Sequence, residues 1–170
     1  MSDNVSKVKE QRGLLERVMS YIPGYRGYKE KEVRRETDRL VRSTAAKFVA
    51  KALDEFRRPL SSLALPDSDR EATDGLLARM DSVRQRTAHA VAGYSGFFDA
   101  VKVKETKLDR LVELDESLID SSKALYEACK AMNSGPATLE AFRTQASVVK
   151  EGVAKLEEAL DEREALLANP

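Results

Sequence analysis

Apolar residues recur every three or four positions along nearly the whole chain, the spacing that places them on one face of an α-helix. Five such patterns, separated by glycine, proline or serine, cover residues 5–22, 28–56, 68–94, 105–132 and 139–167. No segment shows a convincing strand pattern, and residues 101–104 are too few to assign. The pattern therefore predicts an all-α chain.

Helix-breaking and helix-starting residues support these boundaries. Ser68 and Glu71 match a capping box, which predicts that the third helix begins there. Polar residues interrupt the apolar faces of the last two patterns, at Asp115, Ser122 and Arg163. The other predicted stops and starts are Pro23-Gly24, Pro59, Gly93, Gly96, Gly135 and Pro136.

Four of the helices are long, at about 40–45 Å each for a rise of ~1.5 Å per residue. Short connections make consecutive helices antiparallel. We therefore expect residues 1–170 to form a single domain, an elongated antiparallel four-helix bundle. Its two helical hairpins cover residues 28–94 and 105–168, and a short amphipathic helix, residues 5–22, precedes them.

Two short strings resemble each other. GYRGY at residues 24–28 is followed by DRLV at 38–41, and GYSGF at 93–97 is followed by DRLV at 109–112. The two hairpins are therefore either copies of one unit or similar by coincidence. In both cases we interpret each string as an elbow, in which two glycines allow a sharp turn and the aromatic rings fill the end of the bundle.

The strings GYRGYKEKEVRRETDRLVR and GYSGFFDAVKVKE also carry a resemblance. They look like a family of small, helical, uncharacterised prokaryotic proteins, over residues 23–42 and 93–112. The resemblance implies a helical, cytoplasmic protein. It brings no catalytic or binding residues.

The overall charge hides an asymmetry. The formal net charge is zero, with 42% hydrophobic and 34% charged residues, so nothing attracts the whole chain to nucleic acid or anionic lipid. Residues 1–104 nevertheless carry 21 basic and 15 acidic side chains, and residues 105–170 carry 8 and 14. Either the two halves pack together and neutralise each other, or they present separate basic and acidic faces to partners.

The composition favours a cytoplasmic protein. Cys129 is the only cysteine, so no internal disulfide forms, which suits a reducing compartment. The first ten residues lack the apolar core of a signal peptide, and no apolar run approaches the ~20 residues that span a bilayer.

No residue pattern indicates catalysis. His89, the only histidine, follows Arg86 by three positions, so the Glu-x-x-His motif of di-iron bundles is missing. Cys129 lies on an apolar face, as a buried inert thiol does. A ladder of carboxylates at Asp109, Glu113, Glu116 and Asp120 is more typical of a solvated face than of a metal site. We therefore predict a non-enzyme without metal or cofactor.

Basic residues offer a more promising surface. Tyr28, Lys31, Arg35, Arg39 and Arg42 follow one another at helical spacing and form a stripe nearly opposite the apolar face. Like charges at this spacing repel, so something must compensate them. The compensation comes from acidic neighbours in the same helix, from the acidic fourth helix, or from an external phosphate or acidic partner.

The first helix is the second candidate surface. Its narrow apolar seam includes Leu15 and Met19, and basic residues flank it. This helix either docks on the bundle, pairs with another subunit, or lies on anionic lipid. The lipid alternative is weakened by the lack of tryptophan in the chain and of phenylalanine before Phe48.

These surfaces predict a non-catalytic interaction or scaffold protein that binds a protein partner or itself through helix–helix and charged contacts. The alternative is a peripheral protein that binds anionic membrane through the first helix and the stripe. Nucleic acid is a poorer partner, because acidic residues interleave with the stripe and no groove-reading motif is present.

Overall fold

A computed structural model describes residues 2–89, 96–97 and 103–168. These residues are overwhelmingly helical and contain no strand, in agreement with the predicted class. The two short 3₁₀ turns are η1 (Lys31–Val33) and η2 (Arg58–Ser61). The helices are α1 (Ser2–Tyr21), α2 (Arg34–Arg57), α3 (Asp67–Ala88), α5 (Glu105–Ala131) and α6 (Leu139–Leu167).

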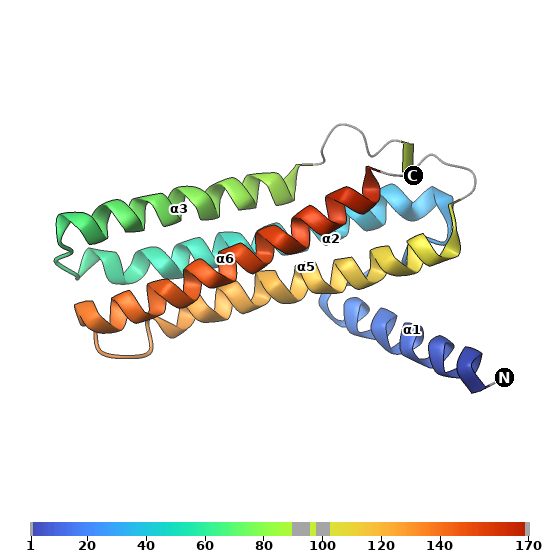
Figure 1. Cartoon of the computed structure of the whole chain (residues 1–170), viewed down its shortest axis with the longest axis horizontal. Helices are drawn as coiled ribbons and strands as arrows, with labels where there is room; N and C mark the ends of the chain where they lie inside the picture. Colours follow the sequence, from blue (N-terminus) through green and yellow to red (C-terminus); the bar gives the residue numbers. More distant parts are fainter. Residues whose placement is uncertain (1, 90–95, 98–102, 169–170) are drawn as a thin grey trace.

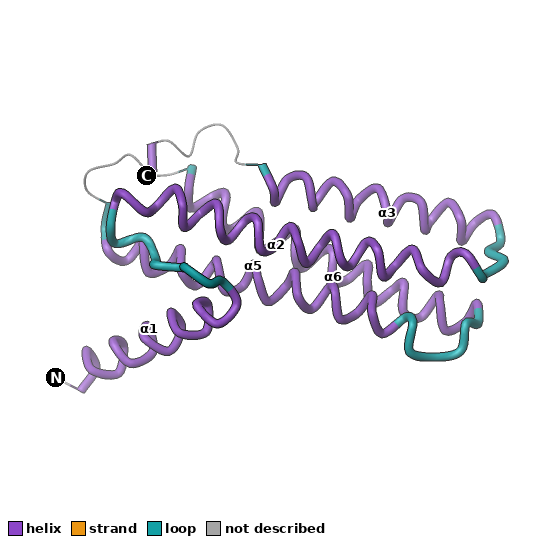
Figure 2. Tube along the Cα trace, turned by 180° about the vertical axis from the view of Figure 1, so that it is seen from behind, coloured by secondary structure: helices purple, strands orange, loops and turns teal. Residues whose placement is uncertain are grey.

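Four long helices lie side by side and give the molecule its elongated shape (Figure 1). Helix α2 packs against α3 and α5, and α6 packs against α5 and α3. Helix α1 touches α5 and then leaves the other helices at an angle, as the opposite views of Figures 1 and 2 show. The elongated body is thus built from α2, α3, α5 and α6, and α1 projects from it.

Helices within one hairpin are antiparallel, but neighbouring helices of different hairpins are parallel. Arg79 of α3 contacts Glu157 of α6, and Arg86 contacts Glu164, both at a separation of 78 residues. Asn133, just beyond α5, and Glu55 of α2 are also 78 apart. A constant separation along two helices means that both run in the same direction. Hairpins α2–α3 and α5–α6 therefore lie side by side in parallel.

The register between the hairpins differs from the sequence repeat. The repeat aligns positions that are 69 to 71 apart, whereas the contacts just described join residues 78 apart. The difference is about one heptad, or two helical turns. Residues aligned by the repeat are therefore not neighbours in space, and the duplication of the hairpin stays a prediction.

Large apolar side chains fill the space between the four helices. Phe56 of α2 and Phe142 of α6 meet with ring centroids 6.1 Å apart, near the end where both hairpins turn. Further buried members include Val49, Met80, Leu111, Leu118, Leu125, Val149, Val153 and Leu156. Within the described ranges, no helix is long and apolar enough to cross a membrane.

The predicted start of the third helix is correct to within one residue, but the predicted capping box is wrong. Helix α3 begins at Asp67, one residue before Ser68, and no side chain caps its first turn, so the capping box does not form. Pro66 precedes the helix instead, and Asp67 and Asp69 place negative charge beside its N-terminus. The last part of the pattern predicted up to residue 94 and most of the second elbow, residues 93–97, lie outside the described residues.

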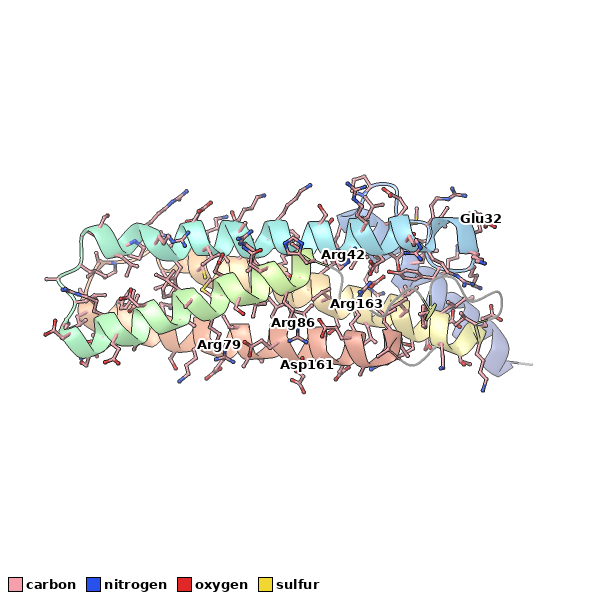
Figure 3. All side chains as sticks on the ribbon, turned by 90° about the horizontal axis from the view of Figure 1, so that it is seen from above. Glu32, Arg42, Arg79, Arg86, Asp161 and Arg163 are labelled. Carbon is pink, nitrogen blue, oxygen red and sulfur yellow. The ribbon has the colours of Figure 1, made fainter. Side chains whose placement is uncertain are left out.

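Ion pairs join the basic first part of the chain to the acidic second part. Arg79 and Arg86 of α3 bind Glu157 and Glu164 of α6, and Lys29 binds Glu105. Figure 3 shows Arg79, Arg86 and Asp161 along this side of the molecule. In the pair of Arg143 and Asp69, the basic residue comes from the second part of the chain and the acidic residue from the first. Mutual neutralisation of the two parts, the first of the two interpretations of the charge asymmetry, is therefore present in the fold.

The Cys129 thiol is buried, and its burial raises the pKa to about 12. Because the thiolate is the reactive form, we expect the native protein to resist alkylation near neutral pH and to react fully in denaturant. Labelling followed by mass spectrometry checks this. Rapid modification of the native chain would mean that α5 opens locally around Cys129.

Candidate functional site

The segment between α1 and α2 makes the predicted elbow. Gly24 and Gly27 have φ values of +87° and +71°, which favour glycine because other residues are strained there. Two such turns point Tyr25 and Tyr28 into the molecule, where each is only 1% exposed. Their rings meet edge to face with centroids 6.3 Å apart. For this elbow, the predicted turns at the two glycines and the burial of the aromatic rings are confirmed, but the rings reach Asp115, ten residues into α5, rather than the end of the bundle.

The hydroxyl groups of the two tyrosines contact a buried carboxylate, Asp115 of α5. The Tyr25 hydroxyl donates to Oδ2 at 3.0 Å, and the Tyr28 hydroxyl donates to the same atom at 2.7 Å. Arg163 of α6 donates from Nε to the other oxygen, Oδ1, at 2.8 Å. All three groups donate to Asp115. Burial raises the pKa of its carboxyl, whereas Arg163 and the two tyrosine hydroxyls lower it.

Asp38 of α2 completes this group. Its Oδ1 accepts from Nη2 of Arg163 at 2.9 Å, and its Oδ2 accepts from Nε of Arg42 at 2.8 Å. Arg42 also donates to the carbonyl of Ala88, the last residue of α3, at 2.7 Å. We call Asp38, Arg42, Asp115 and Arg163, with Tyr25 and Tyr28, the buried ion cluster. It connects all four long helices and the elbow.

Charges inside the cluster balance, because two carboxylates face two guanidinium groups. Asp115 is fully buried and Arg163 is 2% exposed, and every buried side-chain polar atom of the described residues has a hydrogen-bond partner. Burial disfavours the charge on Arg163, but Asp115, Tyr28 and Asp38 raise the pKa of the guanidinium well above its usual value. Figure 3 labels Arg163 in the space between the helices.

The groups of the cluster are paired with one another and join helices that lie far apart in the sequence. Two backbone contacts extend it: Nε of Arg34 donates to the carbonyl of Tyr28 at 2.8 Å, and the Thr37 hydroxyl donates to the carbonyl of Gly27 at 3.0 Å. The cluster therefore fixes the elbow, and with it the direction in which α1 leaves.

The tyrosines make the fold sensitive to alkali. Burial, together with the charge of Asp115, raises the pKa of Tyr25 and Tyr28 far above the ordinary value of 10.0. A raised pKa means that the folded state favours the protonated hydroxyl, so this contribution to stability is complete below pH ~10 and is lost as the pH rises further.

We therefore expect Tyr25 and Tyr28 to ionise only as the protein unfolds in alkali. Tyrosinate absorbance and circular dichroism should change together for these two rings. Ionisation of both rings at about pH 10, with the helical signal intact, would contradict this assignment.

Members of the predicted basic stripe occupy different environments. Lys31, Arg35 and Arg39 are exposed, as expected. Arg42 is half-buried and pairs with Asp38, which confirms that acidic residues of the same helix compensate part of the stripe. Tyr28 is not on this surface, because α2 begins only at Arg34 and the helical spacing does not extend back to it.

Helix α1 docks on the body through its last two turns. Val18 and Ile22 are fully buried, and Leu15 packs against the core. Arg17 pairs with Glu116 of α5. Leu15 and Ile22 of the predicted seam face the body as expected, but Val18 rather than Met19 packs between them, and Met19 is 49% exposed.

The carboxylate ladder of α5 serves ion pairs. Glu113 pairs with Arg110, and Glu116 pairs with Arg17. Among the residues that the structure describes, no group of three or more histidine, cysteine, aspartate or glutamate side chains is arranged to hold a metal ion.

Sequence reasoning missed the role of the buried ion cluster. Asp115 and Arg163 were recognised only as interruptions of two apolar faces. Opposite charges at such positions on consecutive helices are the signal that predicts a buried pair, because neither charge is tolerated there alone. Asp38 and Arg34 gave no comparable signal, since they lie within a run of charged residues.

No protein family, no curated protein and no solved structure matches this chain. The resemblance carried by the two glycine–aromatic strings therefore stays a prediction.

Proposed function

We propose that the chain is a non-catalytic interaction or scaffold protein, in which a rigid four-helix bundle of two antiparallel hairpins presents α1 and the outer surface of α2 to partners. The buried ion cluster supports this division of roles. It ties the elbow to α2, α5 and α6, so that α1 leaves the body in a defined direction. Because its docked end has a fixed direction, α1 is held at a defined place on the body, which suits helix–helix recognition.

The observation that carries the proposal is the position of α1. The helix has 20 residues, and its docking contacts with α5 lie in its last two turns (Figure 2). Of the large apolar side chains in the described residues, Met19 of α1 and Val148 of α6 are the two that are strongly exposed. A helix that leaves the body with an apolar residue uncovered is suited to packing against another helix.

A second candidate is binding to an anionic membrane surface. Residues 39–53 of α2 contain Arg39, Arg42, Lys47 and Lys51 and no acidic residue. Arg39, Lys47 and Lys51 are exposed. Lysine and arginine near an anionic surface contribute about 1 kcal/mol each, and salt screens this attraction.

One double charge-reversal variant and two variants with an apolar residue replaced by aspartate test the proposed partner binding against the native protein. We expect Met19→Asp to weaken partner capture from a lysate, and Arg35→Glu with Arg39→Glu to weaken it when the partner is acidic. Val148→Asp is the matched control, because Val148 is similarly exposed at 46% but lies on α6. The same partners with all four proteins would contradict the proposal.

Vesicle co-sedimentation tests the second candidate directly. Binding to anionic vesicles that disappears in high salt and with Arg39→Glu and Lys47→Glu supports membrane binding. Binding that is equal for neutral and anionic vesicles, or not detected with either, contradicts it.

A further inference from the structure

We propose that the partner of α1 is the α1 helix of a second copy of this chain, and that it inserts into the cleft between α1 and the beginning of α5. The inference deepens the proposed function, on which it rests, by naming one partner and its binding surface. The result is a twofold dimer in which each α1 covers the cleft of the other subunit.

The cleft is open and lined by apolar side chains of both elements. Leu14 and Leu15 of α1 form one wall, and Leu108 and Val112 of α5 form the other. Gly27 and Tyr28 of the elbow also line the cleft. Its volume is about 390 Å³, which accepts the side chains of one helical face but not a whole helix. An incoming helix would thus lay its leucines into the cleft and keep its backbone outside.

The two walls of the cleft carry different charges. Arg12, Arg26 and Lys29 lie on the side of α1 and the elbow together with one acidic residue, Glu30, whereas Asp109 and Glu113 lie on the side of α5. The first side is therefore mainly basic and the second is acidic. A twofold contact requires one patch to be complementary to itself. Here an incoming α1 places its own Arg12 opposite Asp109 and Glu113, and the same contact repeats in the other cleft. This arrangement favours a second copy over a partner of uniform charge.

The part of α1 that projects from the body would be stabilised by packing against a second helix. Isolated helices shorter than about 12–15 residues are only marginally stable in water, so the turns of α1 beyond its contact with α5 gain little from local hydrogen bonds alone. Lys9, Glu10 and Arg12, the described side chains of this part, are all exposed. Pairing of two α1 helices over the clefts stabilises both at once.

Sedimentation velocity of the full chain across a wide concentration range tests this proposal. We expect the mass to rise from 18.9 kDa towards twice that value as the concentration increases. Arg12→Glu and Glu113→Arg should each weaken the dimer by about tenfold or more, because each places like charges together twice. The double variant Arg12→Glu with Glu113→Arg should restore most of the affinity, since the charges are exchanged within one patch.

Leu14→Asp and the control Val148→Asp separate the cleft from the rest of the surface. Leu14→Asp should abolish the dimer, and Val148→Asp should leave it unchanged, with circular dichroism melting curves showing that both proteins fold. A monomer at every concentration overturns the proposal. The proposal is also overturned if none of the cleft variants weakens the dimer, or if the double variant does not regain affinity. Assemblies larger than a dimer would overturn it as well. A monomer whose Met19→Asp variant still loses a different partner would overturn this inference alone and leave the proposed function in place.

Discussion

Replacing Arg163 with methionine is expected to lower the free energy of unfolding by about 3–5 kcal/mol, the loss typical of breaking a buried ion pair. Methionine fills a similar volume but leaves Asp115 without a cation, while Asp38 retains Arg42. The cost is large because the carboxylate stays buried, at 0% exposure, and cannot regain water. Urea unfolding monitored by circular dichroism measures the change.

Two further variants show whether the unpaired charge is the cause. Adding Asp115→Asn to Arg163→Met should recover part of the stability, because the amide oxygen still accepts from the tyrosine hydroxyls and no charge stays unpaired. Arg143→Met breaks an exposed arginine–aspartate pair and should leave the unfolding midpoint nearly unchanged. If the double variant is less stable than Arg163→Met, the buried charge does not explain the loss.

Replacing Tyr28 with alanine is expected to cost a similar amount, about 3–5 kcal/mol, as for other buried aromatic residues. The ring is buried among the helices, and its hydroxyl both donates to Asp115 and accepts from Nη2 of Arg163 at 3.1 Å. Tyr28→Phe keeps the ring and should cost about 1–3 kcal/mol, because one buried hydrogen-bonding position on Asp115 is then unsatisfied. Thermal and urea unfolding of both variants separate the two contributions.

Tyr126→Phe is the control for the hydroxyl, because this ring is only half-buried and lies against Phe48 on the outer side of α2 and α5. Equal stability of Tyr28→Phe and the native protein would show that the hydroxyl does not support the cluster. Loss of partner binding by Tyr28→Phe without loss of stability would instead favour the original assignment of Tyr28 to a binding surface.

Apolar periodicity alone predicted the helices well. The predicted fourth and fifth patterns, 105–132 and 139–167, agree with α5 and α6 to within one residue. Each of these faces is long and regular, and Gly135 and Pro136 mark the break between them. The start of α2 was placed too early, at residue 28, because the charged and aromatic residues before Arg34 imitate helical spacing.

Relations between hairpins were not predictable from the same pattern. Periodicity shows which face of a helix is buried but not which neighbour covers it, so the parallel packing of α2 on α5 and of α3 on α6 was missed. The sequence repeat even indicated a different register. What selects the observed register is specific pairing across the hairpins, of which Arg163 with Asp38 and Arg79 with Glu157 are examples.

The surface candidates were predicted in part. Exposed basic residues of α2 were recognised because they lie opposite a clear apolar face. The seam of α1 was correct at Leu15 and Ile22 but not at Met19, since Val18 and Met19 are both apolar and the structure buries Val18. A short amphipathic helix carries too few apolar positions for periodicity to decide between adjacent faces.

The central claim is that the four-helix body presents the projecting part of α1 to a partner. Hydrogen–deuterium exchange of the full chain at increasing protein concentration tests this claim most directly. The account predicts that amides of α1 before Leu14 exchange rapidly in dilute protein and become protected as the concentration rises, while α5 and α6 stay protected throughout. Protection of these α1 amides that is already complete in dilute protein would show that the helix packs on its own subunit, and would contradict the account.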